Sequence, residues 1–208
     1  MTMRVERLVV GPLQTNCYVL HSDDEVVVID PGAPEPRLLK AVEGHRVRLR
    51  YILLTHAHFD HLEGARALKE AHPESLLCLH EADRPMLERF APGLKLERAL
   101  HEGDLLEFAA EELKVWHTPG HSPGSVIFIH ERERIIFTGD LLFAGSIGRV
   151  DLPGGSPAQM ERSLRRLMQL EGDYRVLPGH GQETALAQER VSNPFLRELG
   201  ELWLPERR

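Results

Sequence analysis

The stretch Tyr51-Ile52-Leu53-Leu54-Thr55-His56-Ala57-His58-Phe59-Asp60-His61 decides what this chain can be. Its first four residues are apolar and predict a buried strand, and the rest carries three imidazoles and a carboxylate. Neutral imidazole is the commonest metal ligand in proteins, and carboxylate is the usual oxygen partner of a divalent ion. Without a metal, these groups would each need a partner if buried, and like charges would repel at low pH. The stretch therefore predicts a metal site behind a strand, ahead of the alternative of a solvated polar turn.

The composition is that of a globular protein with a real core. The 208 residues are 42% hydrophobic, and the formal net charge is −7. Binding to nucleic acid needs a clustered Lys/Arg face, which this charge argues against. The most basic stretch, residues 46–50, alternates with apolar residues, which is typical of the solvated face at the approach to a strand. We therefore expect no nucleic-acid partner.

Membrane and secretion signals are absent from the sequence pattern. No apolar run approaches the roughly 20 residues that a membrane span requires, and the first residues lack the core of a signal peptide. The only cysteines, Cys17 and Cys78, lie inside apolar runs of strand type and are expected to be buried free thiols. We expect a cytoplasmic protein without a membrane partner.

Short runs rich in Val, Ile and Leu alternate with helical patterns along the chain. The runs predict strands at 8–10, 17–20, 26–29, 51–54, 76–79, 105–108, 113–117, 125–130, 134–137 and 175–177. The helical patterns cover 34–42, 61–72, 82–90, 157–170 and 185–191. Strands separated by helices in both halves predict an α/β sandwich of mixed sheets covered by helices. No linker interrupts the pattern, so we expect one domain over residues 1–208.

Three further candidate ligands each follow a predicted strand in a loop rich in Gly and Pro. They are His121 in residues 118–124, Asp140 in residues 138–140 and His180 in residues 178–181. Glycine beside a ligand lets the backbone turn sharply and approach a metal closely, and proline fixes the angle of the loop. Seven candidates are too many for one tetrahedral ion and suit two divalent ions that share a carboxylate. The full set is His56, His58, Asp60, His61, His121, Asp140 and His180.

At this point the chain resembles the metallo-β-lactamase superfamily. The resemblance rests on the His-x-His-x-Asp-His motif and on three later ligand loops in the same order, and it spans about residues 8–191. It implies an αββα sandwich of two mixed sheets flanked by helices, with metals at one edge between the sheets. It also implies a division of the ligands, in which His56, His58 and His121 hold one ion, Asp60, His61 and His180 hold a second, and Asp140 bridges the two.

Details narrow the resemblance to one group. His58 is a histidine where the flavodiiron oxygen reductases have glutamate, and Asp60-His61 supplies nitrogen and oxygen donors to a second site, unlike the β-lactamases that use a cysteine there. The segments 11–17, 30–32 and 178–181 look like those of the glyoxalase II group, thioesterases that act on S-acylglutathiones. The resemblance implies a hydrolase of a small-molecule thioester with two divalent ions (zinc, iron or manganese, of which zinc and iron are favoured). In this scheme Asp60 orients the attacking hydroxide.

Two features depart from the glyoxalase II pattern. Only 28 residues follow His180, where that group has a helical C-terminal domain that helps to hold glutathione. A basic residue is kept nine positions after Asp140, as Arg149, but Asp151 stands where the group has an aromatic residue. The chain is therefore most similar to short, single-domain glyoxalase II-like proteins. We expect Arg149 to recognise a substrate carboxylate, because a guanidinium fork suits that anion.

Other functions stay open on the same residues. The stretch Gly148 to Asp151 resembles the persulfide dioxygenases, which share the fold and carry one iron. In that alternative His56, His121 and Asp140 form a facial triad. A lactonase or related ester hydrolase would use the same ligand set as the thioesterase. A non-enzymatic metal-binding module is disfavoured, because seven ligands leave coordination positions open for water.

The remaining histidines are interpreted one by one. His45, His72, His101 and His130 lie among charged residues and are expected to be solvated. His80 is expected to lie outside the site. His117 and Asp30 are expected to hydrogen-bond to ligands or near them and so to orient them.

The end of the chain carries an apolar stripe. Its residues are Phe195, Leu196, Leu199, Trp203 and Leu204. We expect the stripe to pack onto its own domain, ahead of a dimer contact, so the protein is expected to be a monomer or a homodimer.

Overall fold

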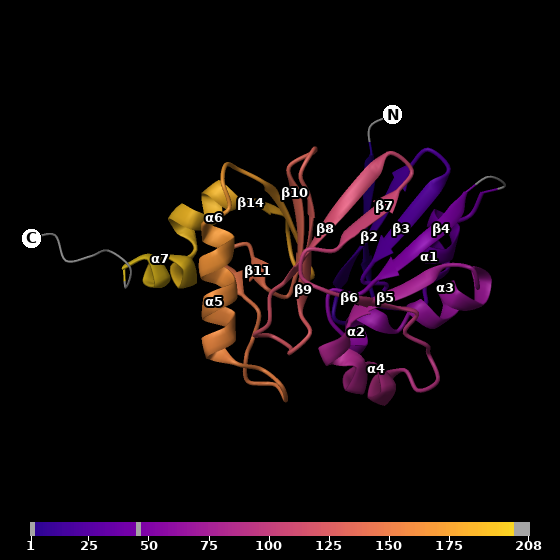
Figure 1. The fold of residues 1–208 in the computed structure, drawn as a ribbon, viewed down its shortest axis with the longest axis horizontal. Coiled ribbons are helices and arrows are strands. Elements are labelled where there is room, and N and C mark those ends of the chain that lie inside the picture. The colour runs from indigo at the N-terminus through magenta and orange to yellow at the C-terminus, as the bar shows by residue number, and fades with distance from the viewer. Residues whose placement is uncertain (1–2, 45–46, 202–208) are drawn as a thin grey trace, which may run out of the picture.

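Two six-stranded β-sheets form the centre of the molecule (Figure 1). The structure is a computed structural model and describes residues 3–44 and 47–201. The first sheet has the strand order β1-β2-β3-β4-β5-β6. Its strands are β1 (Arg4–Val10), β2 (Thr15–Ser22), β3 (Glu25–Ile29), β4 (Arg48–Leu53), β5 (Leu76–His80) and β6 (Arg98–Leu100).

The second sheet contains the later strands in the order β14-β13-β10-β9-β8-β7. These are β7 (Leu105–Phe108), β8 (Glu111–His117), β9 (Val126–His130), β10 (Ile135–Gly139), β13 (Arg175–Pro178) and β14 (Thr184–Ala185). A small hairpin of β11 (Leu142–Phe143) and β12 (Ser146–Ile147) follows β10. Both large sheets contain parallel and antiparallel pairs, so both are mixed, as expected.

Helices cover the outer faces of both sheets (Figure 1). On the first sheet lie α1 (Pro36–Ala41) and α3 (Ala65–Ala71), and α2 (Phe59–Leu62), a 3-10 turn (Glu81–Asp83) and α4 (Arg84–Phe90) lie at its lower edge in that view. The second sheet is covered by α5 (Pro157–Met168), α6 (Leu186–Ser192) and α7 (Pro194–Glu201). The layers run helix, sheet, sheet, helix, which confirms the predicted sandwich.

Each pair of neighbouring layers encloses its own apolar core. Strand β4 shows why, because it pairs with β3 and β5 in parallel and has both faces buried. Ile52 points to the helices on the outside, whereas Tyr51 and Leu53 point to the second sheet. Alternation along a strand sends successive side chains to opposite faces. The apolar run that ends at the histidine cluster is therefore fixed on both sides.

Three differences from the sequence-based expectations have local causes. The helix predicted at 61–72 is two helices, α2 and α3, because the Gly64 N–H bonds to the Pro31 carbonyl at 2.7 Å and leaves no room for a Cβ. Strand β1 begins at Arg4, since seven residues pair with β2. The short strands β6, β11, β12 and β14 and the helix α7 were not predicted.

The histidines that were expected at the surface differ in their exposure. His101 is exposed, as predicted, and His72 is partly buried. The prediction for His130 is wrong: it is buried, because its Nε2 donates to Glu111 Oε2 across two strands at 2.8 Å. His45 lies outside the described residues. Cys17 and Cys78 are buried free thiols, as predicted.

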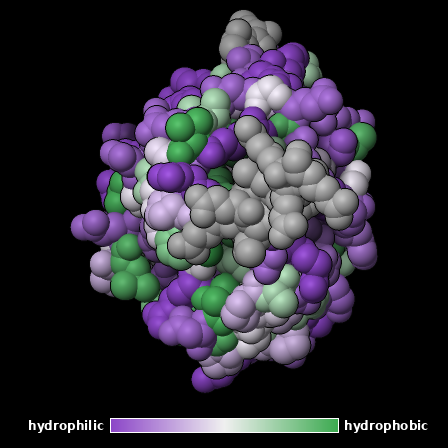
Figure 2. All heavy atoms as spheres, turned by 90° about the vertical axis from the view of Figure 1, so that its left-hand side faces the viewer, coloured by the Kyte–Doolittle hydropathy of each residue, from purple (hydrophilic) through white to green (hydrophobic). Residues whose placement is uncertain are grey.

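The C-terminal helices show how part of the apolar stripe is placed. Leu196 is buried in the outer core of the second sheet, as predicted, and Phe195 is 42% exposed. Trp203 and Leu204 lie outside the described residues, as does the side chain of Leu199. Figure 2, which views this side of the molecule, shows hydrophilic and hydrophobic side chains interspersed where the described atoms are visible. None of the described helices is long and apolar enough to span a membrane.

Candidate metal centre

All seven predicted ligands meet at one edge of the sandwich. The loop after β4 supplies the His56 to His61 cluster, and the loops after β8, β10 and β13 supply His121, Asp140 and His180. These strands belong to both sheets, and their ends converge where α2 begins (Figure 1). Residues 56 and 180, far apart in sequence, thus contribute to the same site.

The ligand atoms form overlapping groups of three. Within each group, one atom of every residue lies within 4.8 Å of the others. The groups are His56, His58 and His121, then His56, His61 and Asp140, and finally Asp60, His61 and His180. The middle group joins the outer two, which is the arrangement expected of two neighbouring ion sites.

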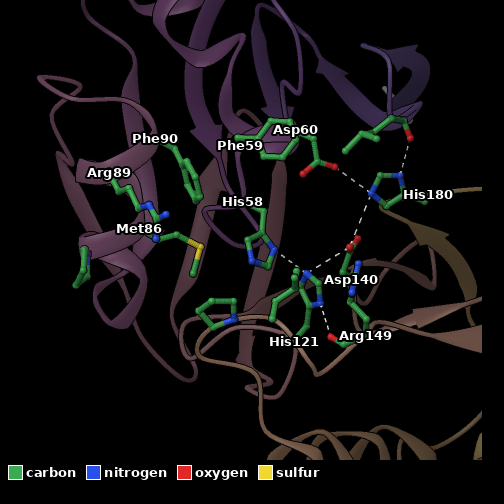
Figure 3. A pocket seen from close by; sticks show the side chains of 14 residues that line it. His58, Phe59, Asp60, Met86, Arg89, Phe90, His121, Asp140, Arg149 and His180 are labelled. Carbon is green, nitrogen blue, oxygen red and sulfur yellow. Dashed lines mark hydrogen bonds and ion pairs between the residues drawn. The ribbon is translucent and has the colours of Figure 1, made fainter.

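Distances between the ligand atoms are short (Figure 3). His58 Nδ1 lies 2.8 Å from His121 Nε2, and His61 Nε2 lies 3.3 Å from His180 Nε2. Asp140 faces both halves of the site. Its Oδ2 is 3.4 Å from His121 Nε2, and its Oδ1 is 3.4 Å from His61 Nε2.

Polar contacts on the outer side of the rings hold two of the histidines that follow β4, His56 and His61. The Thr55 hydroxyl donates to Asp30 Oδ2 at 2.7 Å and lies 3.0 Å from His56 Nδ1, from which it can accept. Asp30 Oδ2 is also 3.0 Å from His61 Nδ1. Partners of this kind fix the orientation of a ligand ring. Asp30 therefore has the orienting role that the sequence predicted.

Backbone carbonyls hold the two later histidines in the same way. His121 Nδ1 bonds to the Arg149 carbonyl at 2.8 Å, and His180 Nδ1 bonds to the Leu13 carbonyl at 3.2 Å. With Nδ1 engaged, each ring turns its Nε2 toward the centre of the site. Four of the five histidines in the cluster thus present Nε2, and His58 presents Nδ1.

The loop that carries His180 is fixed by the start of β2. The Asn16 side-chain amide donates to the carbonyls of Pro178 and Gly181 at 2.9 Å each, and the Tyr18 hydroxyl donates to the Pro178 carbonyl at 2.7 Å. The segment 11–17, which carried part of the family resemblance, thus acts as a clamp on a ligand loop.

Close packing explains one glycine beside the ligands. A Cβ on Gly179 would lie 2.4 Å from Asp140 Oδ1 and 2.7 Å from His61 Cε1. Any side chain there would displace a candidate ligand. Glycine is therefore required by the approach of the backbone to the site.

The two halves of the site differ in their electrostatics. Burial, together with the neighbouring His121 and His61, lowers the pKa of His58 to about 4. Burial also works against the charged form of His61, but Asp140 and Asp30 outweigh it and raise its pKa to about 9. The half with three imidazoles thus favours neutral rings, and the carboxylate-rich half attracts positive charge. Both conditions suit a pair of cations.

Two observations indicate that these nitrogen and oxygen donors are arranged to bind metal ions. His56 Nε2 and Asp140 Oδ1 are buried and have no hydrogen-bond partner among the described residues. Native proteins rarely leave buried polar atoms unpaired unless another group binds them. Two ligands of a tetrahedral ion at about 2.0–2.1 Å lie roughly 3.3–3.4 Å apart. The separations of 3.3 and 3.4 Å given above match this value.

A cavity of about 730 Å³ opens over the cluster. Five of the seven candidate ligands line it: His58, Asp60, His121, Asp140 and His180. Its other walls are mostly apolar and come from Leu13, Phe59, Pro85, Met86, Phe90, Leu152 and Pro153. Two arginines, Arg89 and Arg149, complete the lining. Volume and mixed lining are those of a small-molecule site.

Sequence reasoning missed Asp83. Its position before Arg84-Pro85 is typical of a helix N-cap, but its side chain caps nothing. Instead it accepts from the Ala57 N–H at 3.1 Å and from the Gly124 N–H at 2.6 Å. The Ser122 hydroxyl donates to it at 2.7 Å. Asp83 thus ties the loop of His56 and His58 to the loop of His121, a role that only the fold reveals.

His117, a predicted neighbour of the ligands, has an indirect role. His117 bonds through Nε2 to the Pro123 carbonyl at 2.9 Å, so it supports the loop of His121 and no ligand itself. Its ring stacks on His80 with 3.9 Å between centroids. Among the described residues, neither belongs to a group that could hold a metal. His80 therefore lies outside the cluster, as expected.

Comparison with known proteins agrees with this geometry. Residues 10–180 match the sequence profile of the metallo-beta-lactamase superfamily. The hydroxyacylglutathione hydrolase GloC of Haemophilus influenzae is 33% identical over 93% of this chain and 98% of its own length. TTHA1623, solved in a di-iron-bound form, is 40% identical with a TM-score of 0.83, covering 92% of this chain and all of that one.

Two more solved structures are similar to this chain. The B3 metallo-beta-lactamase BLEG-1 is 34% identical with a TM-score of 0.85, over 93% of this chain and 99% of that one. ETHE1 from Myxococcus xanthus is 25% identical with a TM-score of 0.79, over 98% and 92%. The profile match, the identities and the shared fold lead to one conclusion: this chain belongs to the metallo-β-lactamase superfamily.

Proposed function

We propose that the chain is a single-domain, binuclear metal-dependent hydrolase that cleaves small-molecule thioesters, as glyoxalase II does. The observation that carries the proposal is the convergence of seven ligand side chains, in overlapping groups, beneath one cavity. The similarity to GloC over nearly the whole of both chains supports the substrate class.

In this proposal the ligands divide between two ions. His56, His58 and His121 would hold the first, Asp60, His61 and His180 would hold the second, and Asp140, which lies 3.4 Å from both His61 and His121, would serve both. When bound, two zinc, iron or manganese ions supply a hydroxide at neutral pH and polarise the substrate carbonyl. The nitrogen and oxygen donors suit all three metals.

Asp60 is the residue that orients the nucleophile. Its Oδ2 accepts from the Thr15 hydroxyl at 3.1 Å and lies 3.2 Å from His180 Nε2. Its Oδ1 has no hydrogen-bond partner among the described residues, and Asp60 borders the cavity (Figure 3). Oδ1 can therefore accept a hydrogen bond from the attacking water and hold it toward the carbonyl.

The cavity lining favours a thiolate as the leaving group. Outside the ligand set, the described lining residues include no acid, lysine, tyrosine or cysteine that could protonate a departing group. A thiolate needs no such proton, because a thiol has a pKa near 8.5. An alkoxide is far more basic and gains more from an acid. The lining thus supports a thioesterase ahead of a lactonase or other ester hydrolase.

A second candidate function is the oxidation of persulfides at a single iron. The similarity to ETHE1 and the Arg149–Asp151 pair favour it. That reaction would use His56, His121 and Asp140 as a facial triad. It gives no role to Asp60, His61 and His180, which the structure nevertheless brings to within ligand distance of one another.

Two assays on metal-loaded protein distinguish the candidates. Release of free thiol from S-lactoylglutathione and a simple acetyl thioester is measured without oxygen, and oxygen uptake is measured with glutathione persulfide. We expect thiol release that needs no oxygen. Oxygen uptake without thioester hydrolysis would replace the proposal by the dioxygenase.

A matched pair of variants links the activity to the site. His58→Ala removes a candidate ligand, whereas His101→Ala removes an exposed imidazole that lies 3.7 Å from Asp104. We expect loss of activity in the first and wild-type activity in the second. Full activity of His58→Ala, with metal content verified, would contradict the scheme.

A further inference from the structure

Two arginines border the cavity, and their guanidinium groups are in different states. Arg149 Nε and Nη2 bond to the two carboxylate oxygens of Asp151 at 2.7 and 2.8 Å. Arg89 has no carboxylate partner among the described residues, and its Cζ lies 5.4 Å from the centre of the Phe90 ring. The guanidinium fork of Arg149 is therefore engaged by a carboxylate of the protein itself, and that of Arg89 is not.

Arg89 belongs to a helix face that is turned toward the cavity. Pro85, Met86, Arg89 and Phe90 all line it, whereas Leu87 of the same helix is buried in the core. Figure 3 shows Met86, Arg89 and Phe90 together on one side of the cavity, across from Asp140 and His180. Helix α4 thus presents one charged and three apolar side chains to whatever occupies the space.

The apolar part of this face is extended by α2. The Phe59 and Phe90 rings lie 6.2 Å apart, and they are 40% and 38% exposed. Together with Pro85 and Met86 the two rings form a contiguous apolar surface at the cavity, and such surfaces mark ligand-binding grooves. They would cover the apolar part of an extended substrate between its reacting bond and its free end.

We propose that Arg89 binds a carboxylate at the free end of the substrate's thiol arm, while Phe59, Met86 and Phe90 contact the apolar part of that arm. This inference rests on the proposed thioesterase function and names its substrate class, a thioester of a thiol that carries a terminal carboxylate. A guanidinium offers paired donors that match a carboxylate. A single free positive charge in the described lining suits a monoanion better than a phosphate with nearly two charges.

The proposal differs from the expectation that Arg149 binds the substrate carboxylate. To do so, Arg149 would have to leave Asp151, which already fills its fork with two hydrogen bonds. A substrate carboxylate bound to Arg149 would also lie close to the negative charge of Asp151. Arg89 meets neither obstacle.

The test uses two substrates that differ only at the free end. They are S-acetyl-4-sulfanylbutanoate and its primary amide, which have the same acyl group and the same chain. Arg89→Leu keeps apolar bulk and removes the charge, and Arg149→Leu tests the rival residue. Arg84→Leu is the matched control, because Arg84 lies on the same helix, is bound to Glu81 and does not line the cavity.

For Arg89→Leu we expect KM for the carboxylate substrate to rise about tenfold, with kcat within about twofold, since one charge-assisted contact is lost. Arg89→Leu should hydrolyse the amide substrate as well as the wild type does. Arg89→Lys keeps the positive charge and should retain part of the preference for the carboxylate substrate. Arg84→Leu should match the wild type with both substrates. An unchanged preference in Arg89→Leu, or loss of the preference in Arg149→Leu alone, would overturn the proposal.

A binding measurement separates this inference from the proposed reaction. If the wild type hydrolyses neither thioester, the proposed function fails, and calorimetry with 4-sulfanylbutanoate and its amide then tests Arg89 alone. Tighter binding of the acid by the metal-loaded wild type, reduced about tenfold in Arg89→Leu, would support the anion site. Equal binding of acid and amide, or binding of neither, would reject it.

Discussion

Among the residues that the structure describes, one buried cluster of histidine and carboxylate lies at the metal end and another joins β8 to β9, and they differ in whether their polar atoms have partners. At the metal end, His56 Nε2 and Asp140 Oδ1 are buried without a hydrogen bond. In the other cluster, His130 Nε2 donates to Glu111 Oε2 at 2.8 Å, and His130 Nδ1 accepts from the Glu133 N–H at 3.1 Å. The first cluster is incomplete without a further group, and the second is complete.

Between these two clusters, which share the same residue types, the contrast separates candidate ligands from structural residues. Glu111 also accepts from Ser22 Oγ and from Arg132, so both of its oxygens are engaged. A buried polar group that is fully bonded stabilises the fold, and one that is left unpaired costs stability unless a ligand binds it. Mutation of the metal end should therefore reduce metal binding more than stability. Mutation of the second cluster should reduce stability and leave metal binding unchanged.

The largest effect is expected at the carboxylate that faces both halves of the metal end. Asp140→Ala should lower kcat by more than the 10–100-fold that loss of an outer partner typically costs, and should reduce bound metal. The free energy of unfolding of metal-free protein should fall less than in Glu111→Ala below, because Asp140 Oδ1 has no hydrogen bond to lose and the ion pairs with His61 and His121 are long, at 3.4 Å. Elemental analysis, kinetics and denaturant unfolding measure the three quantities. A variant with full metal content and activity would break the comparison.

The complementary change is Glu111→Ala in the complete cluster. It leaves the buried His130 Nε2–H without an acceptor and Arg132 without its carboxylate partner, and an unsatisfied buried donor costs about 1–3 kcal/mol of unfolding free energy. Loss of the Arg132 pair should add little, because the Arg132 side chain is 53% exposed and can turn to water. Activity per folded molecule should be unchanged.

A surface ion pair nearby provides the control for that measurement. Lys114→Ala breaks the exposed pair with Glu131 and should change stability by less than about 1 kcal/mol. If Glu111→Ala were as mild as Lys114→Ala, the second cluster would not be the structural element described above.

An intermediate effect is expected at Asp83, which joins two ligand loops. The Asp83 carboxylate accepts hydrogen bonds from Ala57, Ser122 and Gly124. Asp83→Asn replaces one accepting oxygen by an amide NH₂, which would face these donors with a donor of its own. Metal affinity of the half with three imidazoles should fall about 10–100-fold, as is typical for partners that orient ligands. Titration with Co²⁺, followed by its absorption spectrum, measures the affinity. Ser122→Ala removes one of the three contacts and should have a smaller effect, and equal affinity in wild type and Asp83→Asn would contradict the role.

The smallest effect is expected at the cysteines, which lie in the apolar cores and not at the metal end. Burial raises the pKa of Cys78 to about 12 and raises the pKa of Cys17 well above its usual value. Because only the thiolate reacts readily, both should stay unreactive toward a thiol reagent from pH 7 to 9. Denatured protein should react with two equivalents. Rapid labelling of the native protein would show that these cores open.

Much of the fold was predictable because it rests on local patterns. The apolar runs predicted the long strands, and the spacing of Met160, Leu164 and Leu167 predicted α5, whose buried face they form. Strands of two or three residues, such as β6 and β14, carry no such pattern and exist through pairing with a neighbour. Gly64 gave no sign in the sequence that Pro31 would accept its N–H and divide a helix.

The residues of the site also divide into those that the sequence predicted and those that only the fold brings together. The candidate ligands were predictable, because imidazole and carboxylate at strand ends have few other uses. Asp83 and Arg89 were not, since an acid before a helix and a basic residue within one are common on surfaces. The partner of His130, Glu111, lies on a different strand, so its burial depends on a pairing that composition does not reveal.

The measurement that tests the central claim most directly is the number of ions bound per chain. Metal-free protein is titrated with Zn²⁺ and, separately, with Fe²⁺ under nitrogen, and bound metal is determined by elemental analysis. We predict two ions per chain in the wild type and one in His180→Ala, which keeps the half with three imidazoles intact. A wild type that binds one ion or none at saturation would contradict the account.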